Sequence, residues 1–154
     1  MDDRRAQPRA VWLADAACEA LHAELALYPK PGLVSFEDNG SHLDMTAATF
    51  VRSIAALRGY FWTMASHGAE APPFAVLERL GIAAERCMLR ATGGINTHRG
   101  SVFALGLLCA AAGISGLSSE GLRRRMLALW GQELAARVTA HDESHGQRAA
   151  QRHG

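Results

Sequence analysis

The sequence predicts an all-α fold, a compact bundle of about five helices. Alanine and leucine, both strong helix formers, dominate a composition that is 49% hydrophobic. Apolar residues recur at steps of three and four in successive segments, and no stretch alternates with the period of two that is typical of a strand. Prolines, glycines and short polar runs separate these segments. A chain of 154 residues is long enough to bury a hydrophobic core.

The first predicted helix covers residues 11–27 and ends at residues 28–32, YPKPG, because two prolines and a glycine cannot continue it. Its apolar stripe consists of Val11, Ala14, Cys18, Leu21 and Leu25. The second helix starts near Asp44 or Thr46, either of which can cap it, and ends at residues 66–68. Its predicted buried side chains are Phe50, Ile54, Leu57, Phe61 and Met64.

Pro72 and Pro73 open the third predicted helix, since proline is tolerated in a first turn, and the glycine pair 93–94 ends it. Its buried face is predicted to contain Val76, Leu77, Leu80, Ala84, Cys87 and Met88. The fourth helix, capped by Asn96 or Thr97, runs to about Ala112.

The fifth predicted helix begins at residues 118–120, and the chain turns polar after Ala140. Its stripe consists of Leu122, Met126, Leu129, Trp130, Leu134 and Val138. The charged residues 1–9 are expected to form a flexible N-terminus before a single helical domain at residues 10–154.

Charge and cysteine content exclude several classes of protein. A formal net charge of +1 gives no argument for a nucleic-acid or membrane partner. Cys18, Cys87 and Cys109 are widely spaced and odd in number, which indicates reduced thiols in a cytoplasmic protein rather than a zinc site. No apolar signal core follows MDDRR, and the longest apolar run, residues 101–117, is short for a membrane span.

The polar run TGGINTHRG at residues 92–100 is the first candidate site. A glycine pair before a helix frees backbone N–H groups, and the helix N-terminus adds positive partial charge. Asn96 can cap this helix, while His98 and Arg99 bring donors into its first turn, where a guanidinium suits phosphate oxygens. The competing interpretation is a tight helix–helix turn, with a C-cap glycine followed by an N-cap asparagine.

The loop between the first two predicted helices is the second candidate. Prolines on both sides hold Lys30 near the end of the first helix, and Glu24 lies one turn earlier. Ser41, His42 and Asp44 return at the start of the second helix. So polar a loop between two apolar helices is typical of a binding site. A solvated loop with an Asp44 cap and a surface lysine would have the same composition.

Two further features are weaker. Glu85 shares a helical face that leads toward the glycine pair, where its carboxylate could hold Mg²⁺ against a triphosphate. An exposed glutamate on a helix is the commoner explanation. His141 and Asp142 form an HD dipeptide, which holds metal in helical phosphohydrolases but also arises by chance.

Six features, taken in order, carry a resemblance to a known family: PKPGLV (29–34), GSHLDM (40–45), Phe50 with Ser53, GIAAERCM (81–88), TGGINTHRG (92–100) and LGLLCAAAG (105–113). They resemble the triphosphoribosyl-dephospho-CoA synthase family, in both its citrate lyase and its malonate decarboxylase branches. The resemblance implies a helical enzyme that joins ATP to 3′-dephospho-CoA and releases adenine. The product is the precursor of an acyl carrier protein's prosthetic group.

The resemblance also implies roles for the candidate residues. The catalytic candidates are Glu24, His42, Asp44 and Glu85. Asp44 and Glu85 are further candidates for binding Mg²⁺, the inferred metal. The substrate- and phosphate-binding candidates are Lys30, Ser41, Gly93, Gly94, Asn96, Thr97, His98 and Arg99. The triphosphate is expected at the glycine pair.

The chain departs from the family pattern in two residues and in length. The family usually has lysine in place of Arg99, which keeps the charge, and aspartate in place of Ser35, which removes a carboxylate. Family members continue into a second half that carries its own acidic, asparagine- and glycine-rich motifs. The resemblance therefore implies the N-terminal half of a larger helical domain, inactive alone.

Other interpretations stay open. The chain could be a nucleotide- or phosphate-binding helical module that complements a second chain. It could also be a metal-dependent phosphohydrolase built around His141 and Asp142. A homodimer is a further possibility, because a helical layer without its partner exposes apolar surface.

Overall fold

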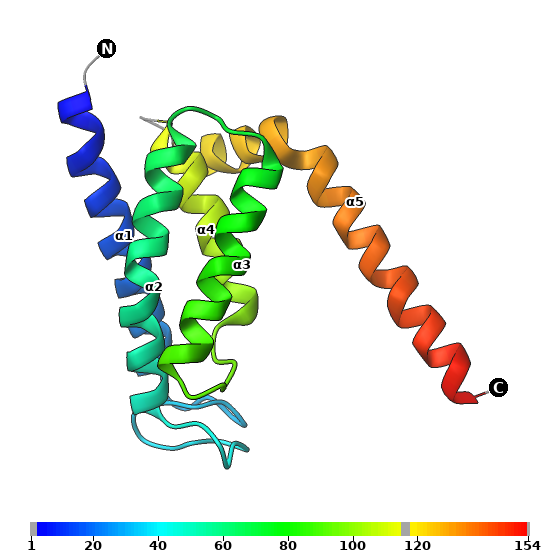
Figure 1. The fold of residues 1–154 in the computed structure, drawn as a ribbon. Helices are drawn as coiled ribbons and strands as arrows, with labels where there is room; N and C mark the ends of the chain where they lie inside the picture. The colour runs from blue at the N-terminus through cyan, green and yellow to red at the C-terminus, as the bar shows by residue number, and fades with distance from the viewer. Residues whose placement is uncertain (1–2, 115–117, 154) are drawn as a thin grey trace.

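The computed structural model describes the backbone of residues 3–114 and 118–153 and the side chains of residues 8–98, 100–114, 118 and 120–137. The described chain consists of five helices without a strand, which confirms the predicted all-α class. The helices are α1 (Asp3–Ala26), α2 (Ala47–Gly68), α3 (Phe74–Ala91), α4 (Arg99–Gly113) and α5 (Ser119–His153). Figure 1 shows α1 to α4 side by side as a bundle, with α5 crossing one end and then leaving it.

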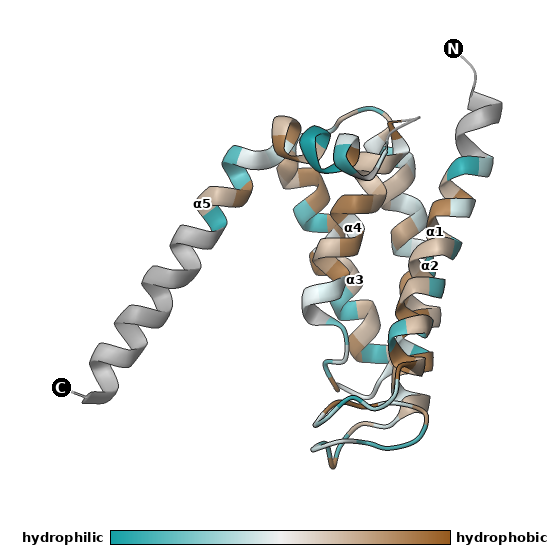
Figure 2. Ribbon diagram, turned by 180° about the vertical axis from the view of Figure 1, so that it is seen from behind, coloured by the Kyte–Doolittle hydropathy of each residue, from teal (hydrophilic) through white to brown (hydrophobic). Residues whose placement is uncertain are grey.

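Helix α2 lies at the centre of the bundle and packs against α1, α3 and α4. Its predicted stripe is confirmed, because Ile54, Leu57, Phe61 and Met64 are almost completely buried, while Phe50 is half-buried. Apolar residues concentrate where the helices face one another (Figure 2). The hydrophobic effect of this shared core therefore holds the four helices together.

The backbones of α2 and α4 approach each other closely where these two helices end. A Cβ on Gly68 would lie 2.0 Å from the carbonyl oxygen of Ala110, and a Cβ on Gly113 would lie 2.1 Å from that of Ala65. No side chain fits in either space, so the backbones approach each other directly. Arg9 adds a hydrogen bond from Nε to the carbonyl oxygen of Ala112, 2.9 Å away. The helices at this end of the molecule are therefore closely packed.

Helix α5 is attached to the bundle through Trp130. The indole ring is 2% exposed, and its Nε1–H donates to the carbonyl oxygen of Pro72 at 2.9 Å. Arg137 and Glu78 add an exposed ion pair of 2.8 Å between α5 and α3. The predicted start of this helix is confirmed, because the Gly121 N–H donates to Ser118 Oγ at 3.2 Å. The helix continues through the polar residues 141–148 to His153.

Two predicted boundaries need correction. Helix α1 begins at Asp3 rather than near Val11. The N-cap residue of α4 is His98, not Asn96 or Thr97. The Thr97 hydroxyl instead donates a hydrogen bond to Ser53 Oγ on α2, so a tertiary contact replaces the expected cap. The division into a flexible N-terminus at 1–9 and a domain at 10–154 stays a prediction.

The predicted cap of α2 and the predicted free cysteines are confirmed. Thr46 is the N-cap residue of α2, and its N–H donates to Thr49 Oγ1 at 3.3 Å. Cys18, Cys87 and Cys109 are free thiols. Across the described residues, no helix combines the length and the apolar character that a membrane crossing requires.

Candidate functional site

Two polar segments meet at the end of the bundle opposite the start of α5. The connection between α1 and α2, residues 27–46, and the junction between α3 and α4, residues 92–98, both lie there (Figure 1). These segments contain most of the predicted site residues. The fold therefore brings the two strongest sequence candidates to one end of the molecule.

The connection between α1 and α2 folds back on itself. The Ser41 N–H donates to the carbonyl oxygen of Gly32 at 3.2 Å, which joins the two arms of the loop. Ser35 is buried, and its Oγ accepts from the N–H groups of Glu37 and Asp38 at 3.2 and 3.1 Å. A short acceptor at position 35 thus closes the turn, a task that serine and aspartate side chains share.

Lys30 is fixed at the end of α1. Its Nζ donates to the carbonyl oxygen of Glu24 at 2.7 Å and to Glu24 Oε1 at 3.0 Å. The lysine side chain is only 10% exposed, whereas that of Glu24 is 49% exposed. The ammonium group therefore sits at the negative end of the helix dipole, held by a partner that remains accessible to solvent.

Gly93 and Gly94 end α3 in the way of a helix C-cap. Gly93 has a φ of +69°, and the Gly94 N–H donates to the carbonyl oxygen of Leu89 at 2.7 Å. This is the long-range bond of a Schellman motif, with glycine at the left-handed position. The glycine C-cap of the tight-turn interpretation is thus confirmed, whereas its asparagine N-cap is not, because His98 is the N-cap residue of α4. The Gly94 N–H is already engaged, which removes it as a donor to a bound phosphate in this conformation.

His98 lies at the centre of a small buried polar cluster. Its Nδ1 is 2.8 Å from Ser53 Oγ and 3.1 Å from Thr97 Oγ1, and the Thr97 hydroxyl donates to Ser53 Oγ at 2.7 Å. The ring is 4% exposed and meets Phe50 in an edge-type contact with centroids 4.9 Å apart. His98 Nε2 is buried without a hydrogen-bond partner among the described residues.

Burial lowers the pKa of His98 to about 4, with a raising contribution from Glu24 and a lowering one from His22. The imidazole is therefore neutral at pH 7. Glu24 and His22 lie on the last turns of α1, a helix that packs against α4. Helix α1, the start of α2 and the α3–α4 junction thus contribute to one site.

Glu85 and Asn96 join α3 to the junction. Asn96 Nδ2 donates to Glu85 Oε1 at 3.4 Å, a long contact near the surface. Asp44 is exposed just before α2, and His42 is held by a backbone bond from its N–H to the carbonyl oxygen of Asn39 at 3.1 Å. In the described part of the chain, no three His, Cys, Asp or Glu side chains gather as a metal site.

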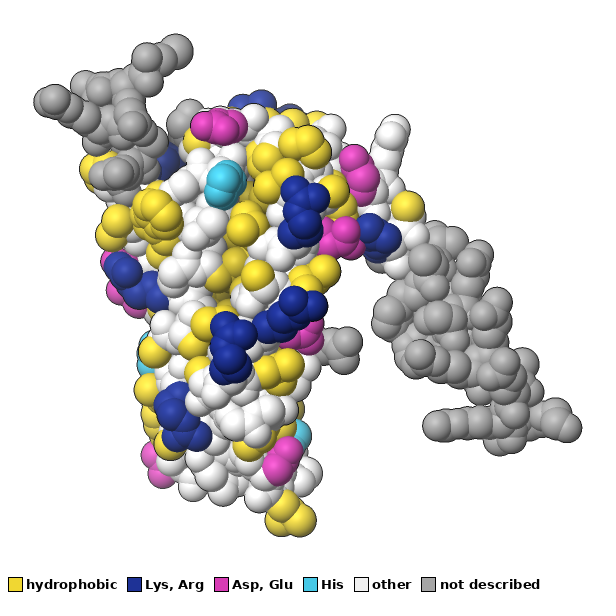
Figure 3. Space-filling model, viewed as in Figure 1, with side chains coloured by type: hydrophobic (Ala, Val, Ile, Leu, Met, Phe, Trp, Pro, Cys, Tyr) yellow, Lys and Arg dark blue, Asp and Glu magenta, His cyan; other side chains and the backbone are white. Residues whose placement is uncertain are grey.

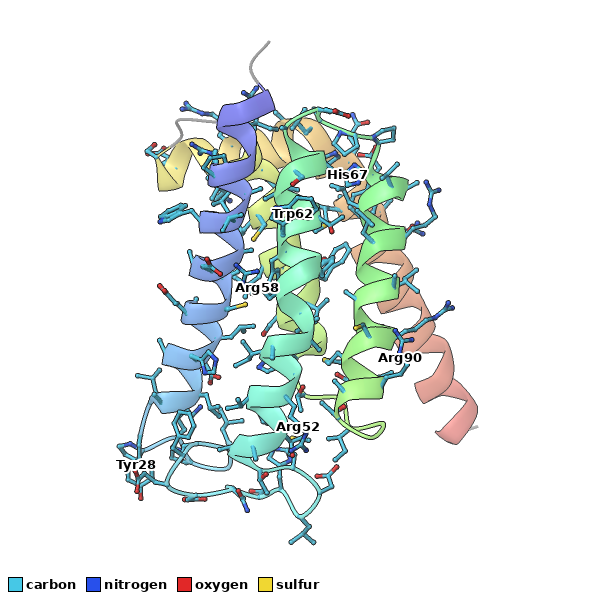
Figure 4. All side chains as sticks on the ribbon, turned by 60° about the vertical axis from the view of Figure 1, so that its left-hand side comes forward. Tyr28, Arg52, Arg58, Trp62, His67 and Arg90 are labelled. Carbon is cyan, nitrogen blue, oxygen red and sulfur yellow. The ribbon has the colours of Figure 1, made fainter. Side chains whose placement is uncertain are left out.

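Basic side chains lie near this end of the bundle. Arginines gather over the face of α2 and α3 (Figure 3), and Arg52 on α2 and Arg90 on α3 lie toward the polar end (Figure 4). Both are exposed. The side chain of Arg99, predicted to bind phosphate, lies outside the described residues, as do those of His141 and Asp142.

Ser53 is the residue that the sequence analysis missed as part of the site. It belongs to the resemblance through its pairing with Phe50, yet it was not among the predicted binding residues. Its position carried a signal, since it lies beside Ile54 and Leu57 on the buried face of α2 and is itself fully buried. A buried hydroxyl needs a partner, so a serine on such a stripe indicates a polar contact across the core.

The sequence matches the family model described as ATP:dephospho-CoA triphosphoribosyl transferase over residues 10–152. A 2-(5″-triphosphoribosyl)-3′-dephosphocoenzyme-A synthase of Pectobacterium atrosepticum is 46% identical over 114 residues, which cover 70% of this chain and 38% of that protein. A probable synthase of the same name from Acinetobacter calcoaceticus is 38% identical over 140 residues, covering 88% of this chain and 48% of the relative.

No solved structure matches the chain. The chain spans about half, or less, of the length of these curated relatives. The family match nevertheless includes both polar segments, most of α1 and the whole of α2, α3 and α4. The chain therefore belongs to the ATP:dephospho-CoA triphosphoribosyl transferase family.

Proposed function

We propose that the protein takes part in the transfer of the triphosphoribosyl group of ATP to 3′-dephospho-CoA. The reaction releases adenine and yields 2′-(5″-triphosphoribosyl)-3′-dephospho-CoA, the precursor of an acyl carrier protein's prosthetic group. One observation supports this most strongly. The PKPGLV and GSHLDM motifs share the connection between α1 and α2, and the TGGINTHRG motif, which follows only after α2 and α3, lies at the same end of the bundle.

The chemistry defines what the site must do. The 2′-hydroxyl of dephospho-CoA attacks C1′ of the ATP ribose, the bond from C1′ to adenine breaks, and a base takes the hydroxyl proton while adenine leaves with a proton. Positive charge develops on the ribose, and a nearby carboxylate stabilises it. We assign these tasks to Glu24, His42, Asp44 and Glu85 as a group. Among these four residues Glu24 is the strongest candidate, because its side chain is accessible to solvent and its charge raises the pKa of His98.

The triphosphate remains intact in this reaction, so the protein has to position it rather than cleave it. We place it between Lys30 and the first turn of α4, whose N-cap side chain leaves the terminal N–H groups uncapped. The residues that would surround it are Lys30, Ser41, Asn96, Thr97, His98 and Arg99. In this arrangement Gly93 and Gly94 shape the turn, and Arg52 and Arg90 attract the anion from solution.

Magnesium fits this site as a companion of ATP rather than as a resident ion. The described residues form no cluster of three ligands, but Mg²⁺ bound to phosphates needs only one or two carboxylates. Glu85 and Asp44 are the proposed contributors. The ion would neutralise phosphate charge, while the protein side chains hold and orient the ribose.

Adenine release from ATP in the presence of dephospho-CoA tests the proposal. Asp44→Asn and Glu85→Gln should each reduce the rate at least tenfold, and Glu70→Gln, an exposed carboxylate at the other end of α2, should not. The assay should use a protein that has the full length of the curated relatives. Unchanged rates in both site variants would rule out the assignment.

A second candidate follows from the share of the relatives that the chain covers. The chain would then be a nucleotide-binding module whose activity requires the remaining segment, supplied in the same or in a second polypeptide. Product from the chain alone contradicts this, and product only after the remaining segment of a relative is added supports it. The predicted homodimer stays a prediction, which the mass of the chain in solution would test.

A further inference from the structure

The cluster around His98 has a definite proton inventory. Ser53 and Thr97 each carry one hydroxyl proton. The Thr97 proton goes to Ser53 Oγ, at 2.7 Å, and Ser53 is left with His98 Nδ1, 2.8 Å away, to receive its own. With this distribution of protons, His98 Nδ1 is the acceptor. A neutral imidazole that accepts at Nδ1 carries its proton on Nε2, and the low pKa of about 4 keeps the ring neutral at pH 7.

The Nε2–H group is thereby presented as a donor with nothing to bind. It is buried and lacks a hydrogen-bond partner among the described residues. The Phe50 ring, whose centroid lies 4.9 Å from that of the imidazole, could offer at most a weak N–H···π contact. A buried donor without an acceptor is costly and uncommon in folded proteins.

The surroundings of this donor are those of an anion site. His98 is the N-cap residue of α4, so the positive end of a helix begins at its own backbone. Glu24, the ion-pair partner of Lys30, also has an electrostatic influence on the imidazole. Two independent features thus converge: an uncapped helix N-terminus and a buried donor lacking an acceptor.

We propose that His98 donates its Nε2–H to a phosphate oxygen of the nucleotide substrate, and that Ser53 and Thr97 are positioning residues that fix the tautomer required. The inference rests on the proposed function for the identity of the nucleotide. Because Nε2 is shielded from solvent, the phosphate has to displace the side chains that cover it. The donor gains its acceptor only in the complex, so its cost in the free protein is recovered on binding.

The tautomer is measured first, in the free chain and without any substrate. A long-range ¹H–¹⁵N spectrum at pH 7 should show His98 protonated at Nε2 in the wild type. The double variant Ser53→Ala with Thr97→Val removes both hydroxyl donors and should lose this preference. Ser66→Ala, on the same helix but at its other end, is the matched control and should keep it. A wild-type ring protonated at Nδ1 would overturn the proposal.

Calorimetric titration then measures the ligand contact with ATP, inorganic tripolyphosphate and adenosine. The double variant and His98→Phe should bind ATP and tripolyphosphate about tenfold more weakly, with adenosine binding and the Ser66→Ala control unchanged. Equal affinities for the phosphate ligands, or a loss confined to adenosine, would refute the contact. If ATP binds as expected but the full-length enzyme releases no adenine, the proposed function fails and this inference stands.

Discussion

The neutral state of His98 makes the stability of the protein depend on pH. The folded pKa of about 4 lies below the usual 6.5, so between these values the unfolded chain binds more protons than the folded one. The contribution of His98 to the free energy of unfolding is fully present above about pH 6.5 and is lost as the pH falls toward 4. Protonation of His98 should therefore destabilise the folded protein as well as change the candidate site.

Lowering the pH from 7 to 5 should reduce the free energy of unfolding by on the order of 2 kcal/mol through His98. Urea titrations at the two pH values measure the loss. His98→Phe removes the titrating group and should show a smaller difference between the two pH values. His67→Phe, an exposed histidine at the other end of α2, serves as the control and should behave like the wild type. A wild-type difference that persists in His98→Phe would assign the effect to other groups.

At the level of elements, the α3–α4 junction allows a test of whether Gly93 is required for its backbone conformation or for ligand binding. Gly93 holds the left-handed position of the α3 C-cap, and a Cβ there would meet nothing within 4 Å. The requirement is therefore one of backbone conformation, which asparagine meets better than other residues with a Cβ.

Gly93→Asn should lower the free energy of unfolding by less than about 1 kcal/mol and leave ATP affinity unchanged, whereas Gly93→Val should cost clearly more stability. Thermal unfolding and calorimetric titration measure the two quantities. If asparagine keeps the stability but abolishes ATP binding, the backbone of Gly93 approaches the ligand closely, and the proposed placement of the triphosphate at α4 is wrong.

Close contact between α2 and α4 gives a second test at this scale. A Cβ at Gly68 would lie 2.0 Å from Ala110 O and 2.4 Å from Ala110 Cα, so alanine forces two backbones apart. Gly68→Ala should destabilise the protein by about 2 kcal/mol or more. Gly59→Ala, on the exposed face of the same helix with nothing within 4 Å, should be neutral or stabilise by up to about 1 kcal/mol. Similar urea midpoints for the two variants would contradict this packing.

The elements of the bundle were predictable because their signals are local. The three- and four-residue spacing of the α2 stripe, the prolines before α3 and the glycine pair after it each act within one or two turns. The start of α4 was not predictable in this way. Thr97 had the right residue type for a cap, but its hydroxyl bonds to Ser53, 44 positions earlier in the chain. The site was predictable as a set of motifs, whereas the pairing inside it depends on tertiary contacts.

At the scale of the whole molecule, the reactivity of the three cysteine thiols can measure unfolding, because each thiol lies between a different pair of helices. Cys18 on α1 and Cys87 on α3 point to the carbonyl oxygens of Ile54 and Ala56 on α2. Cys109 on α4 points to the carbonyl oxygen of Leu13 on α1. Burial raises the pKa of the Cys109 thiol to about 12 and raises that of Cys18 as well, which suppresses their reactive thiolates.

Labelling of Cys109 by a thiol reagent should therefore require unfolding of the bundle as a whole. Its rate in increasing urea should give the same free energy of unfolding as circular dichroism, while the half-buried Cys87 should react earlier. Mass spectrometry of the labelled peptides separates the three sites. If Cys109 reacts with a much smaller free energy than the global one, α4 detaches from α1 while the rest stays folded. The site end of α4, with His98 at its N-cap, would then be built on an element that opens independently of the core.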